Sequence, residues 1–376
     1  MKTRLSYLDW MRGLGAAIML QGHVMDGWLR PEDRSKEWFW RSQFLGGLPS
    51  PIFLFLVGTS LALVLDRLRA KNASSGEMMA RVVRRGGWIL LLAYAFRIEQ
   101  YLVWYPAASW SGVFRVDTLN CIGACTLFIG LASIPLRNRR ANAVLTGAAA
   151  FAVVLLTPYL YVWRAPMGAF IRSYFNGDGN TYYFSVIPWI AFALLGMAFG
   201  FLLIDARERA MEKALFVRIG VAGVCAYAIG AALNLSPVFQ YGFFDYSLTS
   251  PHFFLVRLGY VLLMLYTAYR WSLLALASLW SPLRTLGRAS LLVYWVHIDL
   301  VYGRLLNQFN LTQALSLSQV ALHLSWIFPS MIALAWLKTN WRSLRGLFQQ
   351  FWDRRRGSAA PHFRGSSTTD RSPLVP

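Results

Sequence analysis

Charged residues are scarce in this chain. Asp, Glu, Lys and Arg together make up 14% of its 376 residues, whereas hydrophobic residues make up 56%. A soluble globular protein carries about 25% charged residues, so this chain has too little polar side-chain area to cover a water-facing surface. Cysteine is scarce too, and three cysteines in apolar segments do not form the disulfide framework of a small secreted protein. The composition therefore favours a membrane protein.

Long segments contain no charged residue at all. They are Ser42–Leu65, Thr118–Leu136, Ala141–Trp163, Ser185–Ile204, Ile219–Phe244 and Leu305–Leu337. About 20 helical residues cross the ~30 Å hydrocarbon core, where the backbone must satisfy its own hydrogen bonds. We therefore predict an all-α fold, a polytopic transmembrane bundle of about ten helices near residues 10–29, 46–65, 86–104, 117–135, 142–163, 185–204, 215–233, 252–270, 286–304 and 318–337.

Acidic residues are fewer than half as numerous as basic ones, 17 against 37, which gives a net charge of +20. The basic residues gather in short gaps between apolar segments, as the positive-inside rule requires of cytoplasmic loops. We therefore expect both termini in the cytoplasm. Nucleic-acid binding needs a solvated basic face instead, so we expect no nucleic-acid partner. The gap at 30–45 holds four basic and three acidic residues yet must lie outside, which is compatible with a folded external loop.

The chain divides into two parts at about residue 340. Residues 1–340 form the predicted transmembrane domain, and residues 341–376 form a basic cytoplasmic tail. From about Gly357 onward the tail is rich in Ser, Thr and Pro and lacks periodicity, so we expect disorder toward its end.

The first predicted helix is unusually polar. A charge within a spanning helix costs about 2.5–3.5 kcal/mol on insertion scales, so its presence needs a reason. Arg12 and His23 are eleven residues apart, nearly three full turns, and therefore share one face about 16 Å apart along the axis. Gly15 and Gly22 lie close to that face and permit a neighbouring helix or an elongated ligand to approach. Asp26 could orient the His23 ring or lie on the external rim.

These residues also have structural interpretations. Asp9 and Arg12 could form an interfacial i,i+3 ion pair. The glycines could serve helix packing alone. His23 could be a hydrogen-bonded structural residue without a chemical role.

Polar side chains interrupt four later helices. They are Arg97 with Glu99, Arg115 with Asp117, Arg257 alone, and Arg288 followed by Ser290, Tyr294 and His297. The first two sets could equally be paired charges near an interface. The last three residues fall at i, i+4 and i+7, so they form one polar stripe, either a structural seam or a substrate contact. No zinc-ligand spacing, phosphate loop or dinucleotide glycine pattern occurs, so we predict no metal.

At these residues the chain resembles a known family. The segment Arg4–Gly13 followed by His23 resembles the first helix of the heparan-α-glucosaminide N-acetyltransferase catalytic-domain family, within the transmembrane acyltransferase superfamily, where an Arg and a His separated by ten residues recur. Further blocks are similar in the same order: Pro51–Gly58, Phe114–Gly123, Pro188–Trp189 with Gly196, Pro251–Phe254 through Arg257–Gly259, and Leu286–Arg288 through His297. The resemblance covers most of residues 4–304.

The resemblance implies a membrane-embedded acyltransferase that moves an acyl group, acetyl in the family's name, from cytoplasmic acyl-CoA (acetyl-CoA) to a sugar or glycan acceptor. His23 would be the catalytic base, with Asp26 beside it. Arg12, Arg115, Arg257 and Arg288 would hold the donor, and Asp117, Ser290, Tyr294 and His297 would contact the acceptor. The chain lacks long external insertions, so heparan is not assigned as its acceptor.

Transfer could proceed directly or through an acyl-histidine, and the sequence leaves both routes open. The rival class is a transporter or flippase, in which the same buried Arg, His and Asp residues line a path. We expect a multi-pass protein of a bacterial inner (plasma) membrane whose partners are the lipid bilayer, the acyl donor and the acceptor. A homo-oligomer is compatible with the sequence.

Overall fold

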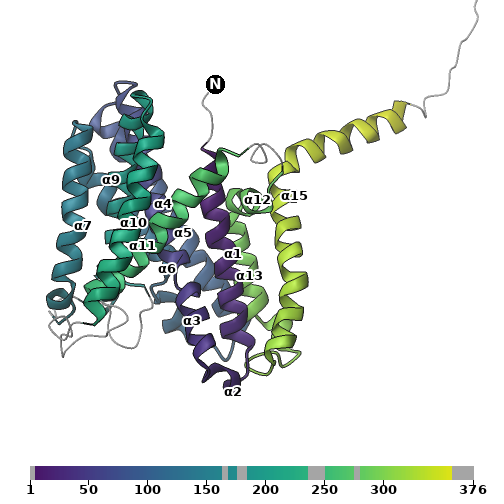
Figure 1. The fold of residues 1–376 in the computed structure, drawn as a ribbon. Helices are drawn as coiled ribbons and strands as arrows, with labels where there is room; N and C mark the ends of the chain where they lie inside the picture. The colour runs from purple at the N-terminus through teal and green to yellow at the C-terminus, as the bar shows by residue number, and fades with distance from the viewer. Residues whose placement is uncertain (1–4, 163–167, 176–183, 236–249, 275–279, 358–376) are drawn as a thin grey trace, which may run out of the picture.

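The computed structural model describes residues 5–162, 168–175, 184–235, 250–274 and 280–357. Within these ranges the fold is built of helices, and an isolated bridge pairs Leu29 with Leu315 (Figure 1). The elements are α1 (Ser6–Trp28), α2 (Pro31–Arg34), α3 (Glu37–Gly46), α4 (Pro49–Arg69), α5 (Ser75–Trp104), the 3₁₀ helix η1 (Trp110–Phe114), α6 (Thr118–Ser133), α7 (Arg139–Val162), α8 (Ala169–Phe175), α9 (Val186–Glu208), α10 (Glu212–Asn234), α11 (Pro251–Ser272), α12 (Pro282–Arg288), α13 (Ser290–Tyr302), α14 (Arg304–Asn307) and α15 (Leu317–Gly357).

The all-α prediction is confirmed. Within the described ranges, six helical segments are long and apolar enough to cross a membrane: Glu37–Arg69, Arg139–Leu160, Val186–Glu208, Glu212–Asn234, Pro251–Ser272 and Leu317–Gly346. Helix α1, which carries three charged residues, is not among the six. The total of about ten spans and the cytoplasmic position of both termini stay predictions. The gap at 30–45 is folded, since α2 and most of α3 occupy it.

Three helix boundaries differ from the predicted ones for local reasons. Helix α5 begins at Ser75, well before residue 86, because Ser74 and Glu77 form a capping box at its N-terminus. The predicted helix at 286–304 is interrupted at Ala289, which separates α12 from α13. Helix α15 continues to Gly357, so the first part of the predicted tail is helical, and residues 358–376 lie outside the described residues.

Helix α1 joins two hydrophobic clusters. Its first turns contribute Met11 to the larger cluster, which α4, α6, α9 and α11 also build. Its later turns contribute Leu20 to the smaller cluster with α13 and α15. Figure 1 shows the same division: α7, α9 and α10 lie on one side of the molecule, and α1, α12, α13 and α15 on the other. The polar face of α1 therefore lies between two packed groups of helices.

Close backbone approaches hold these groups together. Helices α4 and α9 pack through Gly58 and Gly196: a methyl group on Gly58 would overlap the carbonyl oxygen of Ala193, and one on Gly196 would overlap that of Phe55. Small residues of this kind let membrane helices approach until their backbones touch.

We predict that Gly196→Ala destabilises the protein, because the added methyl must push α4 away from α9. Overpacking of this kind costs about 1–3 kcal/mol, which should appear as a lower Tm of the purified protein in detergent. The control is Gly147→Ala on α7, where an added methyl would meet nothing within 4 Å. Equal Tm values for the two variants would contradict the packing described here.

Candidate active site

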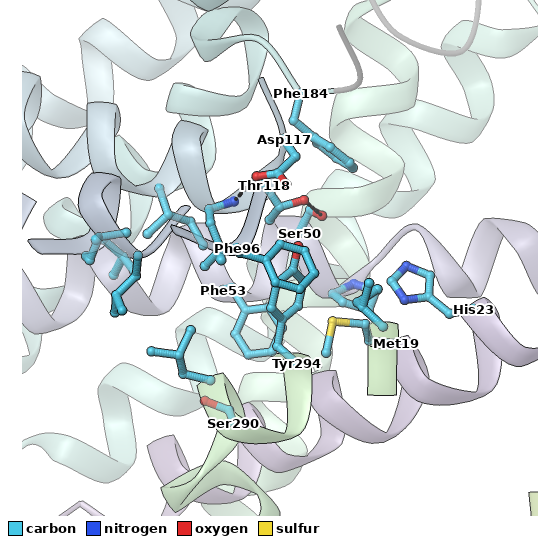
Figure 2. A pocket seen from close by; sticks show the side chains of 18 of the residues that line it. Met19, His23, Ser50, Phe53, Phe96, Asp117, Thr118, Phe184, Ser290 and Tyr294 are labelled. Atoms are coloured by element: carbon cyan, nitrogen blue, oxygen red, sulfur yellow. Dashed lines mark hydrogen bonds between the residues drawn. The ribbon is translucent and has the colours of Figure 1, made fainter. Parts of the chain in front are cut away.

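A cavity of about 890 Å³ opens between α1, α4, α5, α6 and α13. Figure 2 shows side chains of these helices converging on it, among them His23, Phe53, Phe96, Asp117 and Tyr294. Its volume is in the range of pockets that hold small molecules and cofactors. The cavity follows the polar face of α1 from Arg12 to Asp26.

Most of the predicted site residues line this cavity. They are Arg12, His23, Asp26, Arg115, Asp117, Ser290 and Tyr294. The other three predicted residues, Arg257, Arg288 and His297, are not among its lining residues. Arg288 lies 47% exposed with its Nε 3.8 Å from Asp9 Oδ2. His297 is fully buried behind His23.

The two histidines form a hydrogen-bonded pair. Nδ1 of His297 lies 2.6 Å from the carbonyl oxygen of Val293, and Nε2 of His297 lies 2.9 Å from Nδ1 of His23. A carbonyl oxygen only accepts, so Nδ1 of His297 carries the proton, and Nε2 of the neutral ring is left as an acceptor. His23 must then donate from Nδ1, which leaves the lone pair of His23 on Nε2. The buried His297 thus fixes the tautomer of a histidine that lines the cavity.

Asp26 makes its hydrogen bonds with residues other than His23. Its carboxylate accepts hydrogen bonds from the guanidinium of Arg34 and, at 3.1 Å, from the hydroxyl of Tyr302. Its side chain is 48% exposed, which fits the rim of the cavity. Of the two predicted positions, orienting the ring or lying on the rim, the contacts agree with the rim.

At the end of the cavity where α1 begins, two guanidinium groups lie near each other. Arg12 donates to Asp9 at 3.1 Å and to Ser60 at 2.9 Å. Arg85 also lines the cavity, and no carboxylate of a described residue lies within 4.0 Å of it. The helix predicted near 86–104 leaves Arg85 just outside it, in a basic gap between apolar segments. The capping box at Ser74 was the signal that could have placed it inside α5.

At the other end of the cavity, α5 and α6 are joined by an ion pair. Nη2 of Arg97 lies 3.0 Å from Oδ2 of Asp117. Oδ1 of Asp117 accepts from the backbone N–H groups of Leu119 and Asn120 and so caps α6. The sequence paired Arg97 with Glu99, whereas Arg97 contacts Asp117 across the helices. Gln100 and Arg115 also line this end, which therefore mixes both charges with amide groups.

Comparison with known families identifies the family of the chain. Residues 4–230 match the family model described as heparan-alpha-glucosaminide N-acetyltransferase, catalytic. The chain belongs to this family. The match confirms the resemblance seen in the sequence, and it includes Arg12, His23, Asp26, Arg115 and Asp117. No curated protein matches the chain at a significant level.

The family is one of membrane acetyltransferases, and the six apolar helices agree with a protein embedded in a bilayer. The segment that supplies α12 and α13, and with them His297, lies beyond the matched residues. Ser290 and Tyr294 of α13 nevertheless line the cavity, so both parts of the chain build it.

We predict that the stability of Asp117 variants separates the two roles of this residue. Asp117→Asn keeps an oxygen that caps α6 but loses the charge opposite Arg97. Asp117→Ala also loses the cap, which costs about 0.5–2 kcal/mol more. Breaking a buried ion pair costs about 3–5 kcal/mol, so thermal unfolding in detergent should give Tm values in the order wild type, Asn variant, Ala variant.

The matched control is Asp205→Asn, which removes the partner of Arg209 in a more exposed i,i+4 pair. Pairs of this kind contribute about 0.3–0.5 kcal/mol, so its Tm should change little. If Asp117→Asn is as stable as wild type, the ion pair does not join α5 to α6.

Proposed function

We propose that this protein transfers an acetyl group from acetyl-CoA to a hydroxyl or amino group of a sugar or glycan acceptor at the membrane. The observation that carries the proposal is the position of His23: its unprotonated Nε2 belongs to a ring that lines the cavity between the Arg12 end and the Asp117 end. A base with this tautomer can take a proton directly from an acceptor.

The Arg12 end fits the phosphate groups of the donor. Guanidinium groups bind phosphate through paired, charge-assisted hydrogen bonds. Arg12 and Arg85 supply two such groups, and the hydroxyls of Ser60 and Ser290 line the same cavity. The long pantetheine arm would then follow the polar face of α1, about 16 Å from Arg12 to His23. This arrangement brings the thioester carbonyl to the His23 ring.

The Asp117 end fits a sugar. Carboxylate, amide and guanidinium groups from Asp117, Gln100 and Arg97 offer both donors and acceptors to hydroxyl groups. The rings of Phe96 and Phe184 line the same cavity and offer apolar faces. Arg115 contributes a further positive charge. An acceptor bound here would present its nucleophile on the side of His23 away from the donor phosphates.

The reaction needs one proton transfer at His23 in the direct route. Nε2 accepts the proton of the acceptor hydroxyl or amine as the acceptor oxygen or nitrogen bonds to the thioester carbonyl carbon. The carbon–sulfur bond breaks, and the leaving CoA thiolate takes up the same proton from Nε2 to become the thiol. In the two-step route the same Nε2 first bonds to the carbonyl carbon and expels the CoA thiolate. The acceptor then takes the acetyl group from Nε2, and its proton passes to the thiolate. Incubation with labelled acetyl-CoA alone distinguishes the routes, since only the second labels the protein.

We predict that His23→Ala abolishes transfer. Purified protein in nanodiscs would be given radiolabelled acetyl-CoA and a cell-envelope glycan extract, and label in the glycan would be counted. Loss of a general base costs about 10²- to 10⁴-fold in rate, so the variant should retain at most about 1% of wild-type transfer. Unchanged transfer would remove His23 from the mechanism. Net movement of an unmodified glycan into proteoliposomes without acetyl-CoA would instead support the transporter.

A second prediction concerns donor recognition. Arg85→Gln should lower kcat/KM for acetyl-CoA about 10-fold or more, mainly through KM, because a charge-assisted hydrogen bond is worth about 1.5–3 kcal/mol. The same variant should leave kcat/KM for S-acetylpantetheine almost unchanged, because that donor lacks the nucleotide phosphates. Arg84→Gln is the control, since Arg84 is the neighbouring residue on α5 but is exposed outside the cavity. An equal loss with both donors would contradict phosphate binding by Arg85.

A further inference from the structure

A second group of polar atoms lies behind the cavity wall, on α3 and α11. The guanidinium of Arg257 is stacked against aromatic rings, 3.7 Å from the centroid of Phe253 and 5.2 Å from that of Trp189. Stacking leaves the edge of the guanidinium, where its N–H groups point, free to donate. The Nε atom is buried and has no hydrogen-bond partner. Among the described residues, no carboxylate lies within 4.0 Å of this side chain.

Two glycines separate the guanidinium of Arg257 from the cavity. Gly46 and Gly47 line the cavity at the turn between α3 and α4. A methyl group built on Gly47 would lie 3.1 Å from Nη2 of Arg257, so only the missing side chain keeps that edge accessible. Gln43, one turn earlier on α3, has a buried amide nitrogen without a partner, and its side-chain oxygen lies 3.9 Å from a methyl group built on Gly46. Two donors without acceptors therefore flank the same pair of glycines.

The N–H donors of Arg257 and Gln43 favour an anionic ligand. A buried arginine without a carboxylate is costly in a low-dielectric region, and the cost is relieved by an anion that accepts its hydrogen bonds. Guanidinium and amide N–H groups at one place match the oxygens of a phosphate. The aromatic rings and the surrounding membrane helices exclude water and suit an anion that carries an apolar chain.

The geometry points to an oxyanion site at Arg257, Gln43 and Gly47 that binds a phosphate group, carried by a lipid, beside the end of the cavity opposite Arg12. Ser50, three residues after Gly47, lies 3.4 Å from Thr118 next to Asp117, so a phosphate here would hold its attached sugar at the acceptor end. The role as an acceptor anchor rests on the proposed function, whereas the binding of phosphate does not.

The test is the Tm of the purified full-length protein in detergent with three additives: dioleoylphosphatidic acid, inorganic phosphate, and dioleoylglycerol as the lipid without phosphate, all at equal ionic strength. A ligand that binds the folded protein raises Tm by mass action. We expect phosphatidic acid to raise the Tm of the wild type by several degrees, dioleoylglycerol to leave it unchanged, and Arg257→Gln to lose the shift. Arg270→Gln, which removes an exposed arginine of the same helix, should keep it.

A shift with inorganic phosphate that is also lost in Arg257→Gln would support the same oxyanion chemistry with a soluble source. Should Arg257→Gln fail to fold, Gly47→Ala provides the test, because it keeps the charge and fills the space beside the guanidinium. An unchanged wild-type Tm with both phosphates, or an equal shift in wild type and Arg257 or Gly47 variants, would overturn the proposal. Loss of transfer in His23→Ala is a separate result, so either proposal can fail alone.

Discussion

The close approach of α1 to α12 and α13 is the constraint on which the candidate site depends. A methyl group on Gly13 would overlap the carbonyl oxygen of Leu283, and one on Gly287 would overlap that of Asp9. The helices therefore touch backbone to backbone, and further along the same contact the His297 ring meets His23 at 2.9 Å. A hydrogen bond weakens steeply when its atoms separate by several tenths of an ångström. Larger side chains at Gly13 or Gly287 would push α1 away from α12. The hydrogen bond between the two imidazoles would then weaken.

That contact also explains why α1 can be polar inside a membrane protein. The carboxylate of Asp9 is buried between two guanidiniums, Arg12 at 3.1 Å and Arg288 at 3.8 Å. Asp26 is held by Arg34 and Tyr302. The buried Asp9 and the half-exposed Asp26 therefore each have a partner from their own or another helix, and burial makes such a partner necessary for Asp9. The charges near both ends of α1 are thus paired, and His23 lies between them in the helix.

The sequence predicted the parts of this site that depend on one helix. Arg12 and His23 share a face of α1 because their spacing is fixed by helical geometry. Contacts between helices depend on rotation and tilt, which spacing does not determine. For this reason the sequence suggested Glu99 as a possible partner of Arg97, which contacts Asp117, and it did not reveal that His297 contacts His23. Arg85 was missed for a local reason, the unrecognised start of α5, and that error could have been avoided.

Arginines at or beside the cavity differ in whether a carboxylate lies next to them. Arg12 and Arg97 each have a carboxylate within 3.1 Å, whereas Arg85 and Arg257 have none within 4.0 Å among the described residues. Attraction between opposite charges is strong in a low-dielectric region, and a charge left alone there destabilises the fold. Arg85 of α5 lines the cavity, and Arg257 of α11 lies beside Gly47, which lines the same cavity. An anion bound at either arginine would therefore compensate a lone charge and stabilise the folded protein.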